Sequence, residues 1–200
     1  MAADMKPAWP VILQTILIGT AQGLILVVFL LEVFREPPRK FAILCASASL
    51  LLLACALIAS LFRSVRARSA WRAPLAVANF LVLGLASGLM LAVPIAVLAW
   101  PQFAGPLALA AFVVACAAWL SRIAALARNA RLRGKFAAAA RWSALVLLFP
   151  GPGWLLGWGG GSLAAFAAAF ALHFAGVLAE RWVFFAEAAR PRDLHDQAAS

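Results

Sequence analysis

Charged and metal-binding residues are scarce in this chain of 200 residues, of which 12% are charged, three are cysteine and two are histidine. Soluble domains contain about a quarter charged residues, so a soluble fold is excluded. The three cysteines stand singly in apolar stretches, without the two-residue spacing of zinc or iron–sulfur ligands. Only His173 lies in an apolar stretch, because His195 belongs to the polar tail. We therefore expect no metal and no haem held by this chain.

Several sequence motifs of soluble enzymes and transporters are also missing. The glycines at 157–161 do not follow a strand and open a helix, as a phosphate-binding loop requires. No serine, histidine and acid set is spread over soluble elements, and no convincing internal repeat suggests a transporter. We expect a chain that is not active as an enzyme alone, with any redox metals held in other subunits.

Apolar residues, by contrast, are abundant, because 66% of the chain is hydrophobic and the mean hydropathy is +0.98. A helix needs about 20 apolar residues to cross a bilayer. The sequence therefore predicts an all-α fold, a polytopic transmembrane helix bundle that forms one membrane domain over residues 1–200. The expected spans are residues 8–33, 41–62, 74–99, 103–127, 142–160 and 162–187. The first is too long for a cleaved signal peptide and has no cleavage site after it.

The fifth expected span, residues 142–160, is the doubtful one. Residues 150–153 read Pro-Gly-Pro-Gly in its middle, and proline removes helix hydrogen bonds. It is either a kinked span packed against its neighbours or a short half-helix before an interfacial loop. In the second case Trp154 and Trp158 would anchor the membrane surface. The sequence therefore predicts five or six spans.

Basic residues set the expected orientation, because the net charge of +10 is concentrated after the second and fourth spans. These residues are Arg63, Arg66, Arg68 and Arg72, then Arg122, Arg128, Arg131, Arg133, Lys135 and Arg141. Cytoplasmic loops are enriched in such residues, which places the N-terminus and, with six spans, the C-terminus in the cytoplasm of a bacterial inner membrane. The basic loop at 35–40 goes against this. Because the charges flank membrane segments, nucleic-acid binding is not expected.

The last apolar stretch carries ionisable residues every seven positions, at His173, Glu180 and Glu187, which places them on one stripe of a helix. Glu180 and Arg181 are neighbours that point about 100° apart, so we expect them not to pair with each other. Glu180 either snorkels to the interface or serves a membrane-soluble ligand. His173 is either bonded to a neighbouring helix or a proton relay, and Glu187 has Arg190 as a solvated partner.

Small and polar residues mark the first and third spans. The pairs Gly19-xxx-Gly23 and Gly84-xxx-Gly88 are typical of closely packed membrane helices. Polar residues near them either bond helices together or line a ligand cleft, and they are Gln14, Thr15, Thr20, Gln22, Asn79 and Ser87.

Two runs at the ends of the chain carry a resemblance to a known family. Residues 9–24, which start Trp-Pro, and residues 180–188, which read Glu-Arg-Trp-Val-Phe-Phe-Ala-Glu-Ala, resemble the membrane anchor of the dimethyl sulfoxide reductase family, DmsC-like. The resemblance implies an anchor for an iron–sulfur electron-transfer subunit and a molybdenum or tungsten pterin catalytic subunit. It also implies electron exchange with menaquinone or ubiquinone. This chain would be a shortened member, and its tail departs after Ala188, so His195 is not carried over.

The resulting hypothesis places a quinone headgroup near the cytoplasmic ends of the first and last helices. Glu180 and His173 would change protonation there, Arg181 would hold a headgroup carbonyl or contact the partner, and Gln22 is a further candidate. The residues expected to dock the partner are Trp9, Trp182, Phe184, Phe185 and Glu187. Two alternatives stay open, namely a structural anchor whose partner holds the quinone site, and a small transporter or channel.

Overall fold

The computed structural model describes residues 9–61, 74–128, 142, 145–147, 150–158 and 161–188, and over these ranges it contains helices and no strand. Its helices are α1 (Trp9–Phe34), α2 (Arg39–Leu61), α3 (Pro74–Ala99), α4 (Pro101–Arg128), α6 (Pro150–Trp158) and α7 (Leu163–Ala188). Five of them, α1 to α4 and α7, are long and apolar enough to cross a membrane. The predicted all-α membrane bundle is confirmed, and the protein is a multi-pass membrane protein.

The doubtful fifth span has a different structure from the others. Its described part is mainly α6, whose nine residues extend only about 14 Å. Pro150 is the first residue of this helix, a position where the missing N–H costs nothing. Among the described residues, this short helix begins at Pro150. The other predicted spans agree with the helices to within two residues at each end.

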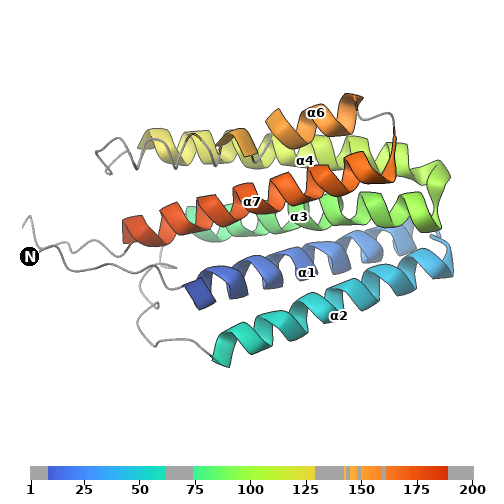
Figure 1. Ribbon diagram of the computed structural model, residues 1–200, viewed down its shortest axis with the longest axis horizontal. Coiled ribbons are helices and arrows are strands. Elements are labelled where there is room, and N and C mark those ends of the chain that lie inside the picture. The colour runs from blue at the N-terminus through green and yellow to red at the C-terminus, as the bar shows by residue number, and fades with distance from the viewer. Residues whose placement is uncertain are drawn as a thin grey trace, which may run out of the picture.

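The direction of each helix determines at which end of the bundle α1 begins and α7 ends (Figure 1). The first four helices alternate in direction, and α7 runs in the same direction as α4. The chain between Arg128 and Leu163 must therefore return across the bundle, and α6 lies along that return beside α4 and α7. As a result α1 begins and α7 ends at the same end of the molecule, which we call the terminal end.

Helices α1 and α3 pack closely through their glycines, as the small-xxx-small pairs predicted. A Cβ atom built on Gly23 would collide with the backbone of Gly84, and one built on Gly88 would collide with the backbone of Gly23. At Gly84 the added atom would lie 2.8 Å from the carbonyl oxygen of Gly19. Because only hydrogen atoms fit at these positions, the two backbones come into direct contact.

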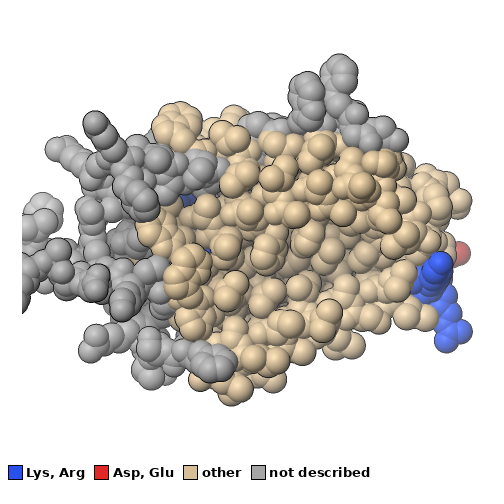
Figure 2. Space-filling view, in the orientation of Figure 1, with Lys and Arg blue, Asp and Glu red and all other residues tan. Residues whose placement is uncertain are grey.

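On the face drawn in Figure 2, most of the described surface carries no Lys, Arg, Asp or Glu side chain. Leu50, Leu51 and Leu57 of α2 are each about two-thirds exposed, as lipid-facing residues are. At the end opposite the terminal end, Trp100 separates α3 from α4 and stacks on Phe103 with ring centroids 4.3 Å apart. The outer surface of the bundle is thus largely apolar, as in a protein that lies in lipid.

Candidate functional site

Glu180 is the centre of a buried ionic cluster near the terminal end of α7. Its side chain is fully buried, with Oε1 3.2 Å from Nε of Arg122 and Oε2 3.3 Å from Nε of Arg181. The expectation that Glu180 and Arg181 cannot pair is wrong. Neighbouring residues leave a helix about 100° apart, but both side chains have several rotatable bonds and curl toward each other. A partner from another helix is also present, and it is Arg122.

Arg122 was expected in a cytoplasmic loop, and this assignment is wrong. It lies in α4 and is 7% exposed, so its charge is inside the protein and takes no part in orienting the loops. Comparing how far each residue lies along its helix could have identified Arg122 as a partner of Glu180. Arg122 follows the start of α4 by 21 residues and Glu180 follows the start of α7 by 17, so they lie about 32 Å and 26 Å along parallel helices.

The cluster contains two guanidinium groups and one carboxylate, and all three residues are buried. Burial excludes the interpretation in which Glu180 snorkels to the interface. Although both ion-pair distances are short, neither carboxylate oxygen accepts a hydrogen bond of good geometry within the described part of the chain. The carboxylate is therefore in ionic contact with two guanidinium groups, and its oxygens can still accept hydrogen bonds. Such an intramembrane group of charges is costly and suggests a function.

His173 lies two turns deeper in α7 and is fully buried. Its Nε2 is 3.1 Å from the hydroxyl oxygen of Ser87 in α3, so the predicted bond to a neighbouring helix is confirmed. The Ser87 hydroxyl also lies 2.8 Å from the carbonyl oxygen of Leu83. Because a hydroxyl has one hydrogen, donating it to Leu83 leaves Ser87 to accept from an Nε2–H group. This arrangement selects the imidazole tautomer that carries its proton on Nε2.

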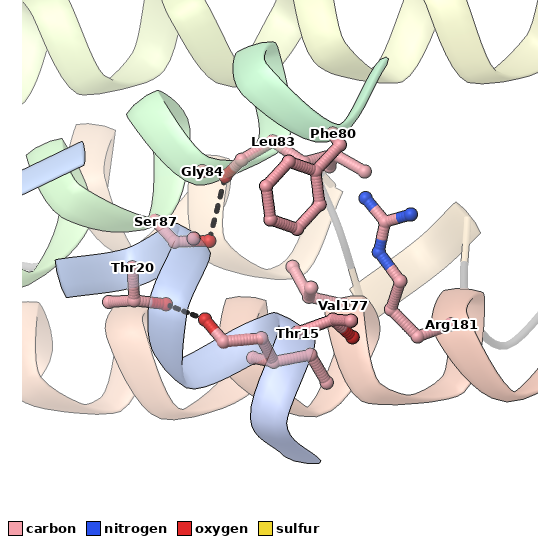
Figure 3. A pocket seen from close by; sticks show the side chains of 10 residues that line it. Thr15, Thr20, Phe80, Leu83, Gly84, Ser87, Val177 and Arg181 are labelled. Atoms are coloured by element: carbon pink, nitrogen blue, oxygen red, sulfur yellow. Dashed lines mark hydrogen bonds between the residues drawn. The ribbon is translucent and has the colours of Figure 1, made fainter. Parts of the chain in front are cut away.

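A small pocket lies beside the cluster, between α1, α3 and α7 (Figure 3). Its volume is about 10 Å³, which is room for about one water. Residues with a hydroxyl, a guanidinium or an aromatic group line it together with small and aliphatic residues, and the surface of the pocket is almost entirely apolar. The polar and aromatic lining residues are Thr15, Thr20, Ser87, Arg181 and Phe80. Phe80 was not singled out in the sequence, because one phenylalanine in an apolar helix carries no signal.

The pocket connects the two polar groups of α7. Arg181 belongs to both the pocket and the ionic cluster, and its Cζ lies 5.2 Å from the centroid of the Phe80 ring. Ser87 belongs to the pocket and contacts His173. Glu180 itself does not line the pocket. A ligand in the pocket would therefore meet Arg181 directly, while Glu180 would act on it through Arg181.

The remaining predicted site residues lie apart from this pocket. The side chain of Gln22 is exposed on α1, and Trp9 is 47% exposed at the start of the same helix. Trp182 is half-buried, and Phe185 packs in the apolar core with Val177 instead of on an open docking surface. The side chains of Phe184, Glu187 and Asn79 lie outside the described part of the structure.

The fold and site together define a polytopic helical membrane protein with a buried ionic cluster in its last helix. The sequence is similar to a sulfite dehydrogenase subunit of Allochromatium vinosum, with 33% identity over a 198-residue alignment that takes in 76% of this chain. The chain spans 58% of that relative's length. No protein-family model matches the sequence. No solved structure matches it either.

Proposed function

We propose that this chain is the membrane subunit of a multi-subunit oxidoreductase and that its pocket beside Arg181 takes part in binding a quinone headgroup. The similarity to a sulfite dehydrogenase subunit supports the first part. The observation that carries the second is the pocket, which joins a guanidinium group to a serine that contacts a buried histidine. A quinone needs both hydrogen-bond donors for its carbonyls and groups that move protons.

The partners would hold the metals. An iron–sulfur subunit would exchange electrons with the membrane chain, and a molybdenum or tungsten pterin subunit would bind the substrate. The described residues of this chain gather no group of three or more His, Cys, Asp or Glu side chains. Sulfite is the first substrate to test, because the similar protein is a sulfite dehydrogenase subunit. Oxidation of sulfite with water to sulfate releases two electrons and two protons.

Each residue of the site then has a defined role. The Arg181 guanidinium donates a hydrogen bond to a headgroup carbonyl, and charge-assisted bonds of this kind are strong. Reduction of a quinone to a quinol takes two electrons, from the reduced cluster of the partner, and two protons. His173 supplies one proton from Nε2 through the Ser87 hydroxyl, which lines the pocket, while its Nδ1 takes up a proton that comes from water. The second proton reaches the headgroup from water. Glu180 and Arg122 fix the position of Arg181 and do not contact the headgroup.

A structural anchor is the second candidate, and the buried ion pairs favour it. Arg122 and Glu180 join α4 to α7, so the cluster would have a use even without a ligand. In that case the partner would hold the whole quinone site. Exposed Trp9 at the terminal end would remain available for docking. The two candidate functions differ in one expectation. Substitutions of the pocket residues should lower quinone-dependent turnover only if this chain takes part in binding the quinone.

The first experiment is gentle detergent purification of the tagged chain, with metal analysis of the proteins that accompany it. Molybdenum or tungsten together with iron is expected, and a homo-oligomer without metal would contradict the proposal. The second is sulfite oxidation by the purified complex with a quinone analogue or with a soluble dye. His173→Gln should reduce the quinone-dependent rate and leave the dye-dependent rate unchanged. Equal quinone rates in the variant and the native complex would instead support the structural anchor.

A further inference from the structure

The Phe80 ring fills a flat space between α1 and α7. On one side, a Cβ built on Gly19 would lie 3.4 Å from the ring atom Cζ, which is ordinary contact distance. On another side, Cζ of Arg181 lies 5.2 Å from the ring centroid, within the range of a cation–π contact. Figure 3 shows the ring standing between the Arg181 guanidinium and the hydroxyls of Thr20 and Ser87. The ring thus separates the two kinds of polar group that line the pocket.

The pocket is too small for a ring-shaped ligand while Phe80 stays in this position. Its volume of about 10 Å³ holds about one water, whereas ligand pockets usually have about 300 to 1,000 Å³. Most of the wall cannot move away, because α1 and α3 are in backbone contact through their glycines. Phe80 is half-buried and turns about only two side-chain bonds. The Phe80 side chain is therefore the part of the pocket wall that can move and enlarge the pocket.

We propose that Phe80 is the gate of the headgroup site, and that a quinone ring takes the place of its side chain when it binds. This inference rests on the proposed quinone function. The quinone ring is flat, as the phenyl ring is, so the space that the Phe80 side chain leaves beside Gly19 takes part of the headgroup. The cation–π contact of Arg181 is exchanged for a hydrogen bond from its guanidinium to a headgroup carbonyl. In the free protein the Phe80 ring separates the hydroxyls of Thr20 and Ser87 from Arg181. When the quinone is bound, these hydroxyls and Arg181 face the same ligand.

A smaller and a larger side chain at position 80 should change the KM for the quinone in opposite directions. Phe80→Ala removes the ring that has to move, so the KM for the quinone should fall severalfold. Phe80→Trp puts a larger ring against Gly19, so the KM should rise by about tenfold, equivalent to about 1.4 kcal/mol of binding free energy. The dye-dependent rate should stay unchanged in both. The assay uses the complex purified with its partner subunits, a quinone analogue and sulfite.

Matched controls are available at the other end of the bundle, where Phe103 stacks on Trp100. Phe103→Ala and Phe103→Trp make the same changes far from the pocket and should leave the quinone KM at the native value. If Phe80→Ala prevents assembly, Phe80→Leu keeps an apolar side chain without a flat ring and should also lower the KM. Thermal unfolding of each variant complex separates folding from binding.

Two results would overturn the gate, and they are distinguishable. Quinone-dependent turnover in the native complex, with native KM values in the Phe80 variants, would remove the gate and leave the proposed function in place. Absence of quinone-dependent turnover in a native complex that still reduces the dye would remove the proposed function and the gate with it. A fall in KM for Phe80→Ala together with a rise for Phe80→Trp would establish the gate.

Discussion

Arg122 in α4 and Glu180 in α7 form an ion pair inside the bundle, with Nε of the arginine 3.2 Å from Oε1 of the glutamate. Arg181 pairs with the second carboxylate oxygen at 3.3 Å. The two guanidinium groups therefore share one carboxylate. This sharing makes Glu180 the residue on which the cluster depends, and it links the position of Arg181 in the pocket to that of Arg122 in α4.

The sharing predicts an order of stability among variants of the cluster. Removing one member of a buried ion pair costs about 3 to 5 kcal/mol. Arg122→Met leaves Glu180 paired with Arg181, so its cost should lie at the lower end of that range. Glu180→Gln removes the carboxylate charge that contacts both guanidinium groups and should cost more. Thermal unfolding in detergent measures both.

Arg39 provides the control for the ion-pair variants. Its side chain is exposed at the start of α2, so Arg39→Met removes the same charge with a change within about 0.5 kcal/mol. An unfolding temperature for Glu180→Gln at or above that of Arg122→Met would contradict the sharing of one carboxylate by two arginines.

The glycines of α1 and α3 should tolerate alanine unequally. Gly23→Ala and Gly88→Ala put a methyl group into the backbone of the facing helix, and overpacking costs about 1 to 3 kcal/mol or more. Gly19→Ala meets the Phe80 ring at 3.4 Å and the Gly84 Cα at 3.6 Å, which are ordinary contact distances, and should be tolerated. Unfolding temperatures in detergent compare the three variants.

Gly105 in α4 is the matched control, because nothing lies within 4 Å of an added Cβ there. Alanine at this position should be neutral or stabilising by up to about 1 kcal/mol, since glycine is a poor helix former. Equal unfolding temperatures for Gly23→Ala and Gly105→Ala would show that α1 and α3 do not pack as described.

The bond between Ser87 and His173 can be isolated with a pair of serine variants. Ser87→Ala leaves Nε2 of the buried His173 without its acceptor, which should cost about 1 to 3 kcal/mol. Ser49 in α2 is equally buried, and its hydroxyl bonds back to Cys45 as that of Ser87 does to Leu83. Ser49→Ala should therefore cost less. The same unfolding midpoint in both variants would argue against a stabilising Ser87–His173 bond.

The arrangement of the helices predicts that both ends of the chain lie on one side of the membrane. Reporters fused before α1 and after α7 should be active in the same compartment, and the distribution of basic residues predicts the cytoplasm. Glu36 lies in the α1–α2 loop and is exposed, so Glu36→Cys should react with an impermeant maleimide from the periplasm. The native chain, with its three cysteines, is the control. Reporters active in different compartments would contradict the return of the chain between α4 and α7.

Much of the fold could be predicted from local sequence. The five long apolar segments gave helix ends to within two residues, because a stretch of this length and hydropathy in a bilayer must satisfy its backbone hydrogen bonds as a helix. The glycine pairs predicted close packing, because few other arrangements use two small residues one turn apart. The short helix α6 was one of two open alternatives, since a proline can either interrupt a helix or begin one.

The candidate site depended on contacts that a sequence does not display. His173 and Glu180 could be named, because a titratable residue in an apolar helix is rare in any fold. Their partners Ser87 and Arg122, and the Phe80 ring beside Arg181, are supplied by α3 and α4 and are selected only by how those helices pack. Sequence by itself therefore determined which long helices form and identified two of the buried polar groups, His173 and Glu180. Tertiary structure decided which of them meet, because side-chain pairing between helices depends on their relative rotation and depth.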